Sequence, residues 1–372
     1  MSYQRGLKRL MLEPTDLVGQ CEWTSPISRE AMIALTGIDP MADTEAAFVR
    51  LYEVFDLDVS WGGAPAGKPL DWDHPEQYED QPISQWGIFA SYFKAHGAHL
   101  APREFSSPEE VFEFDPLEYD PRTEDELKDI YQAQFDAWRR QLGDRCLPLA
   151  GWYTTLFHWG IAIFGWENFM AAAALYPERY DRLLGRFFQV SRRHLSALAR
   201  VEGMPALISH DDIAMTRGLV FRPDWYRQYI IPRYRELWRP AKERGKKVLF
   251  CSDGNFQELI PDIAEAGADG FIIEPLIDLH WLAENYGQTH VIIGGVDTKV
   301  LQSANPDGVW AEVERVFNAL GRCPGFFVNA SGQLTHLISV ENMKAYLEAT
   351  RYYRRAYGLA GQQTQARRTG AQ

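Results

Sequence analysis

Short apolar runs separated by amphipathic segments dominate the pattern of hydrophobic and polar positions along the chain. The later runs are continuous rather than alternating, which is typical of strands buried on both faces of a parallel sheet. Eight runs have the apolar and β-branched character of strands: residues 17–23, 56–61, 147–154, 205–212, 246–253, 269–275, 290–297 and 324–332.

The segments between the later strands have helical spacing, and several end at a glycine. They lie at residues 223–245, 255–267, 281–287 and 305–321. Strands that alternate with such helices indicate βαβ units and a parallel sheet. Eight strands without a Gly-rich dinucleotide fingerprint favour an α/β fold of the (β/α)8 TIM-barrel type over a doubly wound sheet.

The domain organisation follows from the segments in which strands and helices do not alternate in this way. Residues from about 62 to 146 are rich in Pro, Trp and acidic residues, and we predict a long insertion that lies over the barrel mouth. Residues 1–357 are therefore predicted to form a single barrel domain. Residues 358–372 form a polar tail, which we expect to be disordered.

Charge and cysteine usage narrow the class of protein. The formal net charge of −13 argues against a nucleic-acid or anionic-membrane partner. No apolar stretch approaches the ~20 residues that would span a bilayer, and the first residues lack a secretory signal. The four cysteines have neither metal-site spacing nor the density of a disulfide scaffold. We expect a reduced, cytoplasmic protein, and a homodimer is one of the assemblies that the sequence leaves open.

Polar side chains follow five of the predicted strands in succession. In a (β/α) barrel the carboxyl ends of the strands surround the active site, so these side chains are candidate site residues. They are His210, Asp211 and Asp212 on the fourth strand, Cys251 and Asp253 on the fifth, Glu274 on the sixth, Asp297 on the seventh, and Asn329 and Ser331 on the eighth, with Gln333 and His336 beyond it.

The stretch VLFCSDGN at 248–255 is the sharpest of these signals. Cys251 and Asp253 are two residues apart, so an extended chain points both to one side. This spacing suits two ligands of one metal ion, or a thiol beside a base. The alternative is an inert buried cysteine and an aspartate that caps the following helix.

Aromatic residues gather near the ends of the early strands. Such a wall suits a flat or apolar organic substrate, although aromatic residues also fill ordinary cores. The group comprises Trp23, Trp61, Trp152, Tyr153, Trp159 and Trp166, and we add the neighbouring His158 as a substrate-binding candidate.

Motifs in the second half of the chain resemble the uroporphyrinogen decarboxylase superfamily. The resemblance runs from about residue 147 to 357 and rests on the motifs DD…RG, SDGN, AGADG, GGVD and ENM. It implies a (β/α)8 barrel and one of two activities, tetrapyrrole decarboxylation or corrinoid-linked methyl transfer.

The sequence departs from the decarboxylase branch. Members of that branch carry an N-terminal FRQAGRY-like stretch whose arginines bind the porphyrinogen carboxylates, whereas this chain has VGQCEWTSP at the matching place. The aspartate-bearing loop after the second strand is replaced by SWGG at 60–63, and the late GH motif reads SGQ at 331–333. Because neighbouring aromatic residues do not replace a bidentate guanidinium, we predict that uroporphyrinogen is not the substrate.

The methyltransferase branch implies a zinc ion held by a HxC pair on the fifth strand and a later cysteine. Here the HxC positions are Cys251 and Asp253, and the later position falls around Asn329–Ser331. A thiolate and a carboxylate both bind zinc, and Glu274, His210 or His336 could complete the set. The ligand set expected from the resemblance is Cys251, Asp253, Glu274 and His210.

These observations predict an enzyme that transfers or removes a methyl group of a small organic substrate, with a corrinoid protein as partner. The runner-up is a decarboxylase or other carbon–carbon lyase, and the third reading is a non-catalytic ligand-binding barrel. The predicted catalytic residues are Asp212, Asp253 and Glu274. The predicted substrate-binding residues are Trp23, Trp61, Tyr153, His158, Asp211, Asp297, Asn329, Gln333 and His336.

Overall fold

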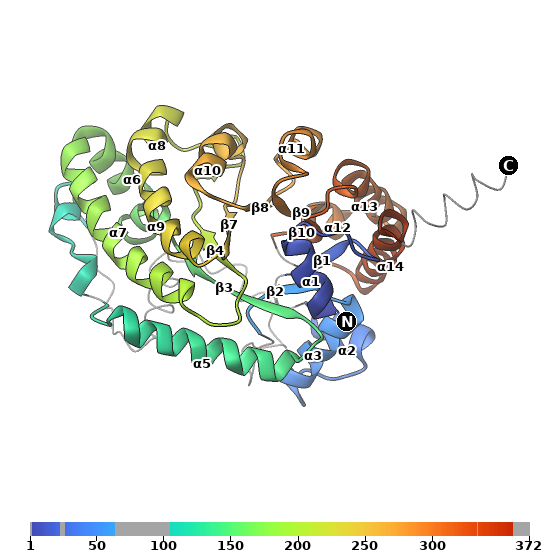
Figure 1. Ribbon diagram of the computed structural model, residues 1–372. Coiled ribbons are helices and arrows are strands. Elements are labelled where there is room, and N and C mark those ends of the chain that lie inside the picture. Colours follow the sequence, from blue (N-terminus) through green and yellow to red (C-terminus); the bar gives the residue numbers. More distant parts are fainter. Residues whose placement is uncertain (1, 23–26, 64–104, 119, 333, 360–372) are drawn as a thin grey trace.

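Eight parallel strands close into a barrel in a computed structural model that describes residues 2–22, 27–63, 105–118, 120–332 and 334–359 (Figure 1). Their order around the barrel is β1-β10-β9-β8-β7-β4-β3-β2. The strands are β1 (Gly19–Glu22), β2 (Val59–Trp61), β3 (Leu147–Tyr153), β4 (Ala206–His210), β7 (Lys247–Cys251), β8 (Gly270–Ile273), β9 (Val291–Asp297) and β10 (Phe326–Ser331). All eight strands predicted from the sequence are present, and the prediction of a TIM-type barrel is confirmed.

The pairing register places the carboxyl ends of the strands on one rim. His210 at the end of β4 pairs with Cys251 at the end of β7, and Ser331 of β10 pairs with Asp297 of β9. The barrel closes through β1, whose Cys21 pairs with Val59 of β2. Because every pair in the barrel is parallel, polar residues that follow strands far apart in the sequence meet at the same rim, as the sequence predicts.

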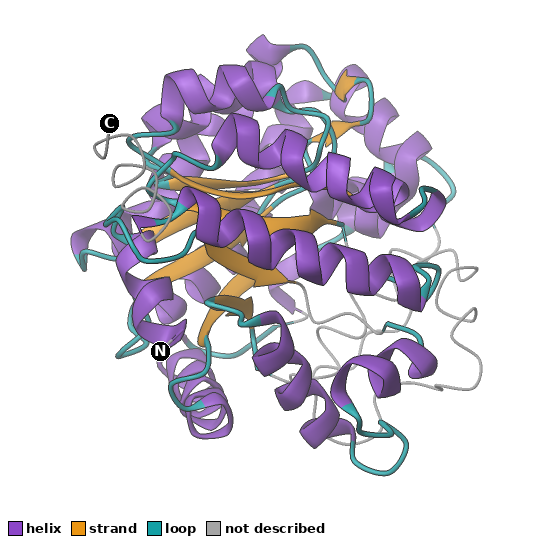
Figure 2. Ribbon diagram, turned by 90° about the vertical axis from the view of Figure 1, so that its right-hand side faces the viewer, coloured by secondary structure: helices purple, strands orange, loops and turns teal. Residues whose placement is uncertain are grey.

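Helices surround the barrel on the outside (Figures 1 and 2). They are α1 (Ser2–Leu10), α2 (Arg29–Thr36), α3 (Thr44–Phe55), α5 (Glu124–Leu142), α6 (His158–Leu175), α7 (Pro177–Ala199), α8 (Pro223–Tyr229), α9 (Ile231–Glu243), α10 (Ile260–Ala266), α11 (Leu279–Tyr286), α12 (Thr298–Ser303), α13 (Pro306–Leu320) and α14 (Val340–Tyr357). Short 3-10 turns lie at Glu110–Glu113, Pro116–Glu118 and Gln257–Leu259, and a small hairpin is formed by β5 (Ala214–Met215) and β6 (Gly218–Leu219).

The segment that we predict as an insertion has more than one character. Its last part, Glu124–Leu142, is helix α5, which begins with a capping box at Thr123 and Glu126. This helix packs against β3 and α7, so it occupies the place of an ordinary helix between β2 and β3. Residues 64–104 lie outside the described residues, as do residues 360–372, so the position of the insertion and the disorder of the tail stay predictions.

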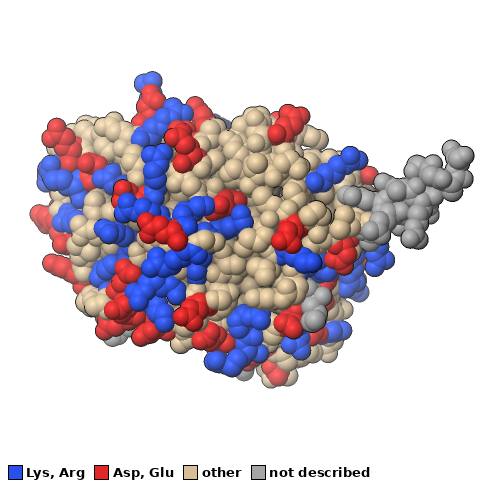
Figure 3. All heavy atoms as spheres, in the orientation of Figure 1, with Lys and Arg blue, Asp and Glu red and all other residues tan. Residues whose placement is uncertain are grey.

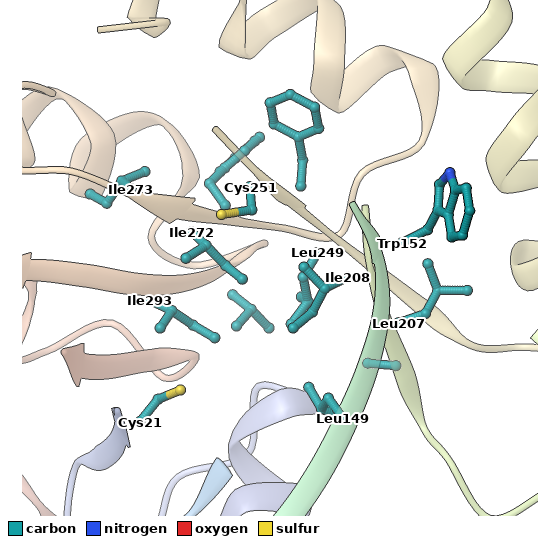
Figure 4. Close-up of a cluster of buried hydrophobic side chains, with 14 of the residues drawn as sticks. Cys21, Leu149, Trp152, Leu207, Ile208, Leu249, Cys251, Ile272, Ile273 and Ile293 are labelled. Carbon is teal, nitrogen blue, oxygen red and sulfur yellow. The ribbon is translucent and has the colours of Figure 1, made fainter. Parts of the chain in front are cut away.

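The barrel interior is filled with aliphatic side chains and two cysteines. Figure 4 shows Cys251 beside Ile272, with Leu249 and Ile208 next to each other in the same cluster. Cys251 has an exposed fraction of only 4%, and Cys21 is similarly buried. The thiol of Cys251 therefore contributes to packing in the barrel as well as reaching the rim.

Charge is distributed unevenly over the surface. On the face shown in Figure 3, Lys and Arg side chains gather together with acidic ones over the region of α7, α9 and α5. Among the described helices, none combines the length and apolar character needed to cross a bilayer.

A buried charged cluster joins α7 to the segment before α5. The Asp120 carboxylate is fully buried and lies 2.6 Å from Nε2 of His194. It also accepts two hydrogen bonds from the Arg122 guanidinium, at 2.6 and 2.8 Å. Burial alone would raise the pKa of Asp120, but His194 and Arg122 outweigh it and hold the pKa below its usual range.

This lowered pKa predicts a loss of stability in acid. A carboxyl whose folded pKa is depressed stabilises the protein above its unfolded pKa of about 4, and the contribution is lost as the pH falls below that value. We expect the free energy of unfolding to decrease below about pH 4, with a contribution from Asp120 on the order of 1–3 kcal/mol. Urea denaturation at a series of pH values from 7 to 3 measures this decrease in the free energy of unfolding. An Asp120→Asn variant with the same pH dependence as the wild type would contradict the assignment.

Candidate active site

A cavity of about 310 Å³ opens at the carboxyl rim of the barrel. It brings together seven of the residues predicted from the sequence, which come from six different strands or from the turns that follow them. The described lining residues are Trp61, Tyr153, His210, Cys251, Ser252, Asp253, Ile272, Ile273, Glu274, Asn329 and Gly332.

The turn after β7 is shaped by Gly254. This residue has a φ of +78°, and a Cβ on it would lie 2.7 Å from the backbone of Ala214, so only glycine fits without displacement. Its amide donates to the Glu274 carboxylate at 2.7 Å. The amide of Asp253 donates to Asp212 at 2.9 Å. The SDGN turn thus connects the ends of β4, β7 and β8, and it leaves the Asp253 side chain open to the cavity.

A hydrogen-bonded network surrounds the Asp212 carboxylate. Oδ1 of Asp212 lies 2.9 Å from Nε2 of His210, and Oδ2 accepts a hydrogen bond from the Tyr153 hydroxyl at 2.9 Å. Nδ1 of His158 lies 3.9 Å from the same Oδ2. The ring of His210 is flanked by two aromatic rings, with centroid distances of 5.4 Å to Trp61 and 4.2 Å to Tyr153.

The partners of Asp212 and His210 set their protonation. Burial alone would raise the pKa of Asp212, but the neighbouring His210 lowers it below the usual range. Burial alone would lower the pKa of His210, but Cys251 and Asp212 raise it well above its ordinary value. Both shifts favour the charged forms of the two residues, whose Oδ1 and Nε2 atoms lie 2.9 Å apart.

Asp253 and Cys251 are shifted in the opposite sense. Burial, followed by the charge of Asp212, raises the pKa of Asp253 to about 7. Burial also raises the pKa of the Cys251 thiol, although His210 partly opposes this effect. Both shifts favour the protonated forms of the two side chains.

Three of the rim residues could hold a metal ion. The ligand atoms of His210, Asp212 and Asp253 lie within 4.8 Å of one another. One imidazole and two carboxylates are a suitable donor set for a divalent cation. This group shares His210 and Asp253 with the set expected from the sequence, includes Asp212, and omits Cys251 and Glu274.

Asn329 and Glu22 form a second polar group behind the cavity. The amide nitrogen of Asn329 donates to the Cys21 carbonyl at 3.0 Å and lies 3.4 Å from the Glu22 carboxylate. Glu22 also accepts from Tyr346 and from the backbone of Ala330, and burial raises its pKa to about 7. The sequence analysis did not single out Glu22, although its place at the end of the first strand follows the pattern of the other polar strand ends.

Asp211 faces away from the cavity. Its carboxylate is fully buried and accepts hydrogen bonds from five donors at 2.7–2.9 Å: the backbone amides of Leu156, Phe157 and His158 and the hydroxyls of Thr154 and Tyr234. These contacts anchor the start of α6 to the end of β4. The structure gives Asp211 an architectural role, and its carboxylate is not available to a ligand in the cavity.

Three other predicted residues in the described part of the chain are not among the lining residues of the cavity. Asp297 caps helix α12 by accepting from the amide of Lys299 at 2.8 Å. His158 lies behind Asp212, and its Nδ1 is buried without a hydrogen-bond partner. His336 is half-buried in the loop before α14 and is not among the lining residues. Trp23 and Gln333 are outside the described residues.

Of the predicted aromatic wall, Trp166 is exposed at the surface, and the other described members divide into two parts. Trp61 and Tyr153 line the cavity. Trp152 is fully buried and stacks on His194 at a centroid distance of 3.5 Å, and Trp159 is buried beside Phe187. Trp152 and Trp159 therefore pack with α6 and α7 and are ordinary core residues.

Comparison with known proteins identifies a family. The model of the family described as "Uroporphyrinogen decarboxylase (URO-D)" matches residues 97–353, more than half of the chain. No curated protein sequence is significantly similar to the chain.

Solved structures support the same fold. A structure described as a methyltransferase from Methanosarcina mazei is 16% identical in sequence, with a TM-score of 0.63, and the match covers 95% of this chain and 98% of that one. A D-psicose 3-epimerase structure is 10% identical over 64% of this chain and 88% of that one, with a TM-score of 0.38. At these identities the first likeness concerns the fold alone, and the second adds nothing to it.

Proposed function

Because the chain belongs to the uroporphyrinogen decarboxylase (URO-D) family, we propose that it is a URO-D-like enzyme that transfers a methyl group from a small organic substrate. The acceptor in this proposal is a reduced corrinoid carried by a partner protein. A methyltransferase from Methanosarcina mazei shares the fold, so the barrel itself is compatible with methyl transfer. The charge of the cavity supports this branch over the decarboxylase branch.

The observation that carries the proposal is the sign of the ionisable groups around the cavity. The described lining residues include the carboxylates of Asp253 and Glu274 and no Lys or Arg. Among these described residues the one basic group, His210, is already hydrogen-bonded to Asp212. A substrate for decarboxylation carries at least one carboxylate, which would meet two acidic side chains and no guanidinium among these lining residues. A methylated alcohol, phenol or amine carries no such charge.

The site residues have distinct roles in this proposal. Asp253 and Glu274 contact the heteroatom that bears the methyl group, because they are the acids in the wall of the cavity. Asp212 orients His210 through their hydrogen bond, and Tyr153 fixes Asp212 from the other side. Trp61 and Tyr153 supply apolar faces for the substrate, and Asn329 supplies a polar contact from β10.

The same residues fit a divalent cation. His210, Asp212 and Asp253 would be its ligands. A cation bound there would supply a Lewis acid that polarises the bond to the leaving heteroatom. Metal analysis of the purified protein, with Asp253→Asn as the comparison, measures whether this group is used.

Two assays on the purified protein test the proposed activity. Free cob(I)alamin, offered together with a panel of methylated amines and methyl ethers, should be converted to methylcobalamin with at least one donor, as followed by its absorption spectrum. Uroporphyrinogen should not be decarboxylated, because the cavity is at the small end of ligand pockets and its described lining residues include no arginine. Accumulation of coproporphyrinogen at an enzymatic rate, without methyl transfer, would overturn the proposal in favour of the lyase reading.

The reading as a non-catalytic barrel makes a different prediction for the carboxylates. It is favoured when the acidic groups lie far apart, whereas ligand atoms of Asp212 and Asp253 lie within 4.8 Å of each other. Ligand binding without turnover in every assay would restore that reading.

A further inference from the structure

The described hydrogen-bond donors in the cavity wall are largely used within the protein. The Tyr153 hydroxyl donates to Asp212, and Nε2 of His210 lies against the same carboxylate. The Ser252 hydroxyl donates to the backbone carbonyl of Asp253 at 2.8 Å. These three side chains therefore have little to offer to a ligand that needs donors.

Several acceptors, in contrast, lack a described donor, and the residues that carry them line the cavity. Asn329 has an exposed fraction of 1%, and its Oδ1 is buried without a hydrogen-bond partner among the described residues. Its amide orientation is fixed, because Nδ2 donates to the Cys21 carbonyl and the Glu22 carboxylate. If the amide were flipped, Oδ1 would face these two acceptors and no hydrogen bond could form. In the described part of the chain no side chain donates to the Asp253 carboxylate, and one oxygen of Glu274 is bonded to Gly254.

A buried acceptor without a partner lowers stability unless a ligand supplies the donor. Oδ1 of Asn329 would thus be satisfied by a ligand that carries an N–H or O–H donor. The carboxylates of Asp253 and Glu274 attract a positively charged ligand, and the aromatic faces of Trp61 and Tyr153 also favour a cation. A neutral methyl ether satisfies none of these groups, and a quaternary ammonium satisfies the charge but leaves Oδ1 unpaired.

We infer that the cavity binds a protonated N-methylamine, a secondary or tertiary ammonium ion. Its N–H donates to Oδ1 of Asn329, its charge is neutralised by Asp253 and Glu274, and its methyl groups pack against Trp61 and Tyr153. This inference rests on the proposed function and names its class of substrate.

Methyl transfer from such an ion balances without an added acid. The C–N bond breaks with its electron pair remaining on nitrogen, so the amine leaves neutral and keeps its N–H proton. The methyl group forms a bond with Co(I) of the corrinoid acceptor, which becomes Co(III).

Calorimetric titration of the full-length protein tests the inference without any corrinoid. The probes at pH 7 are trimethylammonium, tetramethylammonium and the neutral tert-butanol. We expect trimethylammonium to bind about tenfold more tightly than tetramethylammonium, equivalent to about 1.4 kcal/mol, and tert-butanol to bind more weakly than either cation. Equal binding of the three probes, or no binding of the two cations, would overturn the inference.

Two variants separate hydrogen bonding from charge. Asn329→Leu should abolish the preference for trimethylammonium and leave tetramethylammonium binding nearly unchanged. Glu274→Gln should weaken both cations by a similar factor and keep their ratio, and it gives an independent test if the Asn329 variant does not fold. A preference that survives Asn329→Leu in folded protein, or tetramethylammonium binding unaffected by Glu274→Gln, would contradict the assigned contacts.

The competing occupant is a metal ion on His210, Asp212 and Asp253, which would repel an ammonium ion. Prior addition of Zn²⁺ or Mn²⁺ should therefore weaken the binding of trimethylammonium. Tight metal binding in a protein that never binds trimethylammonium would identify the metal as the cation and overturn the inference. Methyl transfer from a neutral ether by a protein that does not bind ammonium ions would refute the substrate class and leave the proposed function standing.

Discussion

Replacing Asp253 with asparagine is expected to lower the rate of methyl transfer by about 100-fold or more, with a change of only about 1 kcal/mol in the free energy of unfolding. The Asp253 side chain is open to the cavity and accepts no hydrogen bond from a described side chain, so little packing is lost. Its carboxylate lies at the centre of the proposed site, because one of its oxygens is within 4.8 Å of the ligand atoms of both His210 and Asp212. Turnover assays and urea denaturation of the same preparation measure the two effects.

Glu258→Gln is a matched control, since Glu258 is an exposed acid a few residues farther along the same segment. It should change neither activity nor stability appreciably. Wild-type turnover by folded Asp253→Asn protein would remove Asp253 from the site. Cys251→Ala is a less clean test than its position in the sequence indicates, because the thiol is 4% exposed and packs in the barrel. We expect that variant to lose stability as well as activity.

Asp211→Asn is expected to lower the free energy of unfolding by about 3–5 kcal/mol, the range for breaking a buried charged network. Asparagine has the same shape, but its NH2 group would face donors that now meet a carboxylate oxygen. The start of α6 and the end of β4 would both lose their anchor. Urea denaturation at pH 7 measures the loss, and low yield of soluble protein would be its most extreme form.

Thr154→Val provides a graded comparison. It removes one of the five donors to Asp211 and leaves the carboxylate in place, so a loss of about 1 kcal/mol is expected. If Asp211→Asn were as stable as the wild type but inactive, Asp211 would act on the substrate rather than on the fold. The neighbouring residues Asp211 and Asp212 would then have to exchange the roles that their geometry indicates.

The barrel could be predicted from the sequence because its signals are local. Continuous apolar runs such as 246–253 and 290–297 indicate buried parallel strands, and the helices between them indicate right-handed βα units. The insertion was harder to delimit. Glu124–Leu142 is an ordinary outer helix with a capping box, but its many charged residues and the Pro- and acid-rich stretch before it obscured its apolar face.

The sequence also placed the candidate site on one rim, because parallel strands bring their carboxyl ends together whatever their separation in the chain. It could not say which side chains at a strand end face the cavity. Asp211 and Asp212 are adjacent and chemically identical, yet one is surrounded by five donors and the other pairs with His210. Side-chain direction alternates along an extended strand, and the turn that follows β4 decides the final orientation of each carboxylate.

The sequence by itself determined the fold, the rim and the excess of acidic over basic groups near it, since these depend on hydrophobic periodicity and composition. Only the tertiary structure decided which polar atoms are satisfied. The amide of Asn329 is fixed by Cys21 and Glu22, more than 300 residues away in the chain, and the amide of Gly254 holds Glu274 across a turn. Hydrogen bonding requires atoms to meet within about 3 Å in a defined direction. Such meetings between distant segments are fixed by barrel closure and register, which a local pattern of residues does not encode.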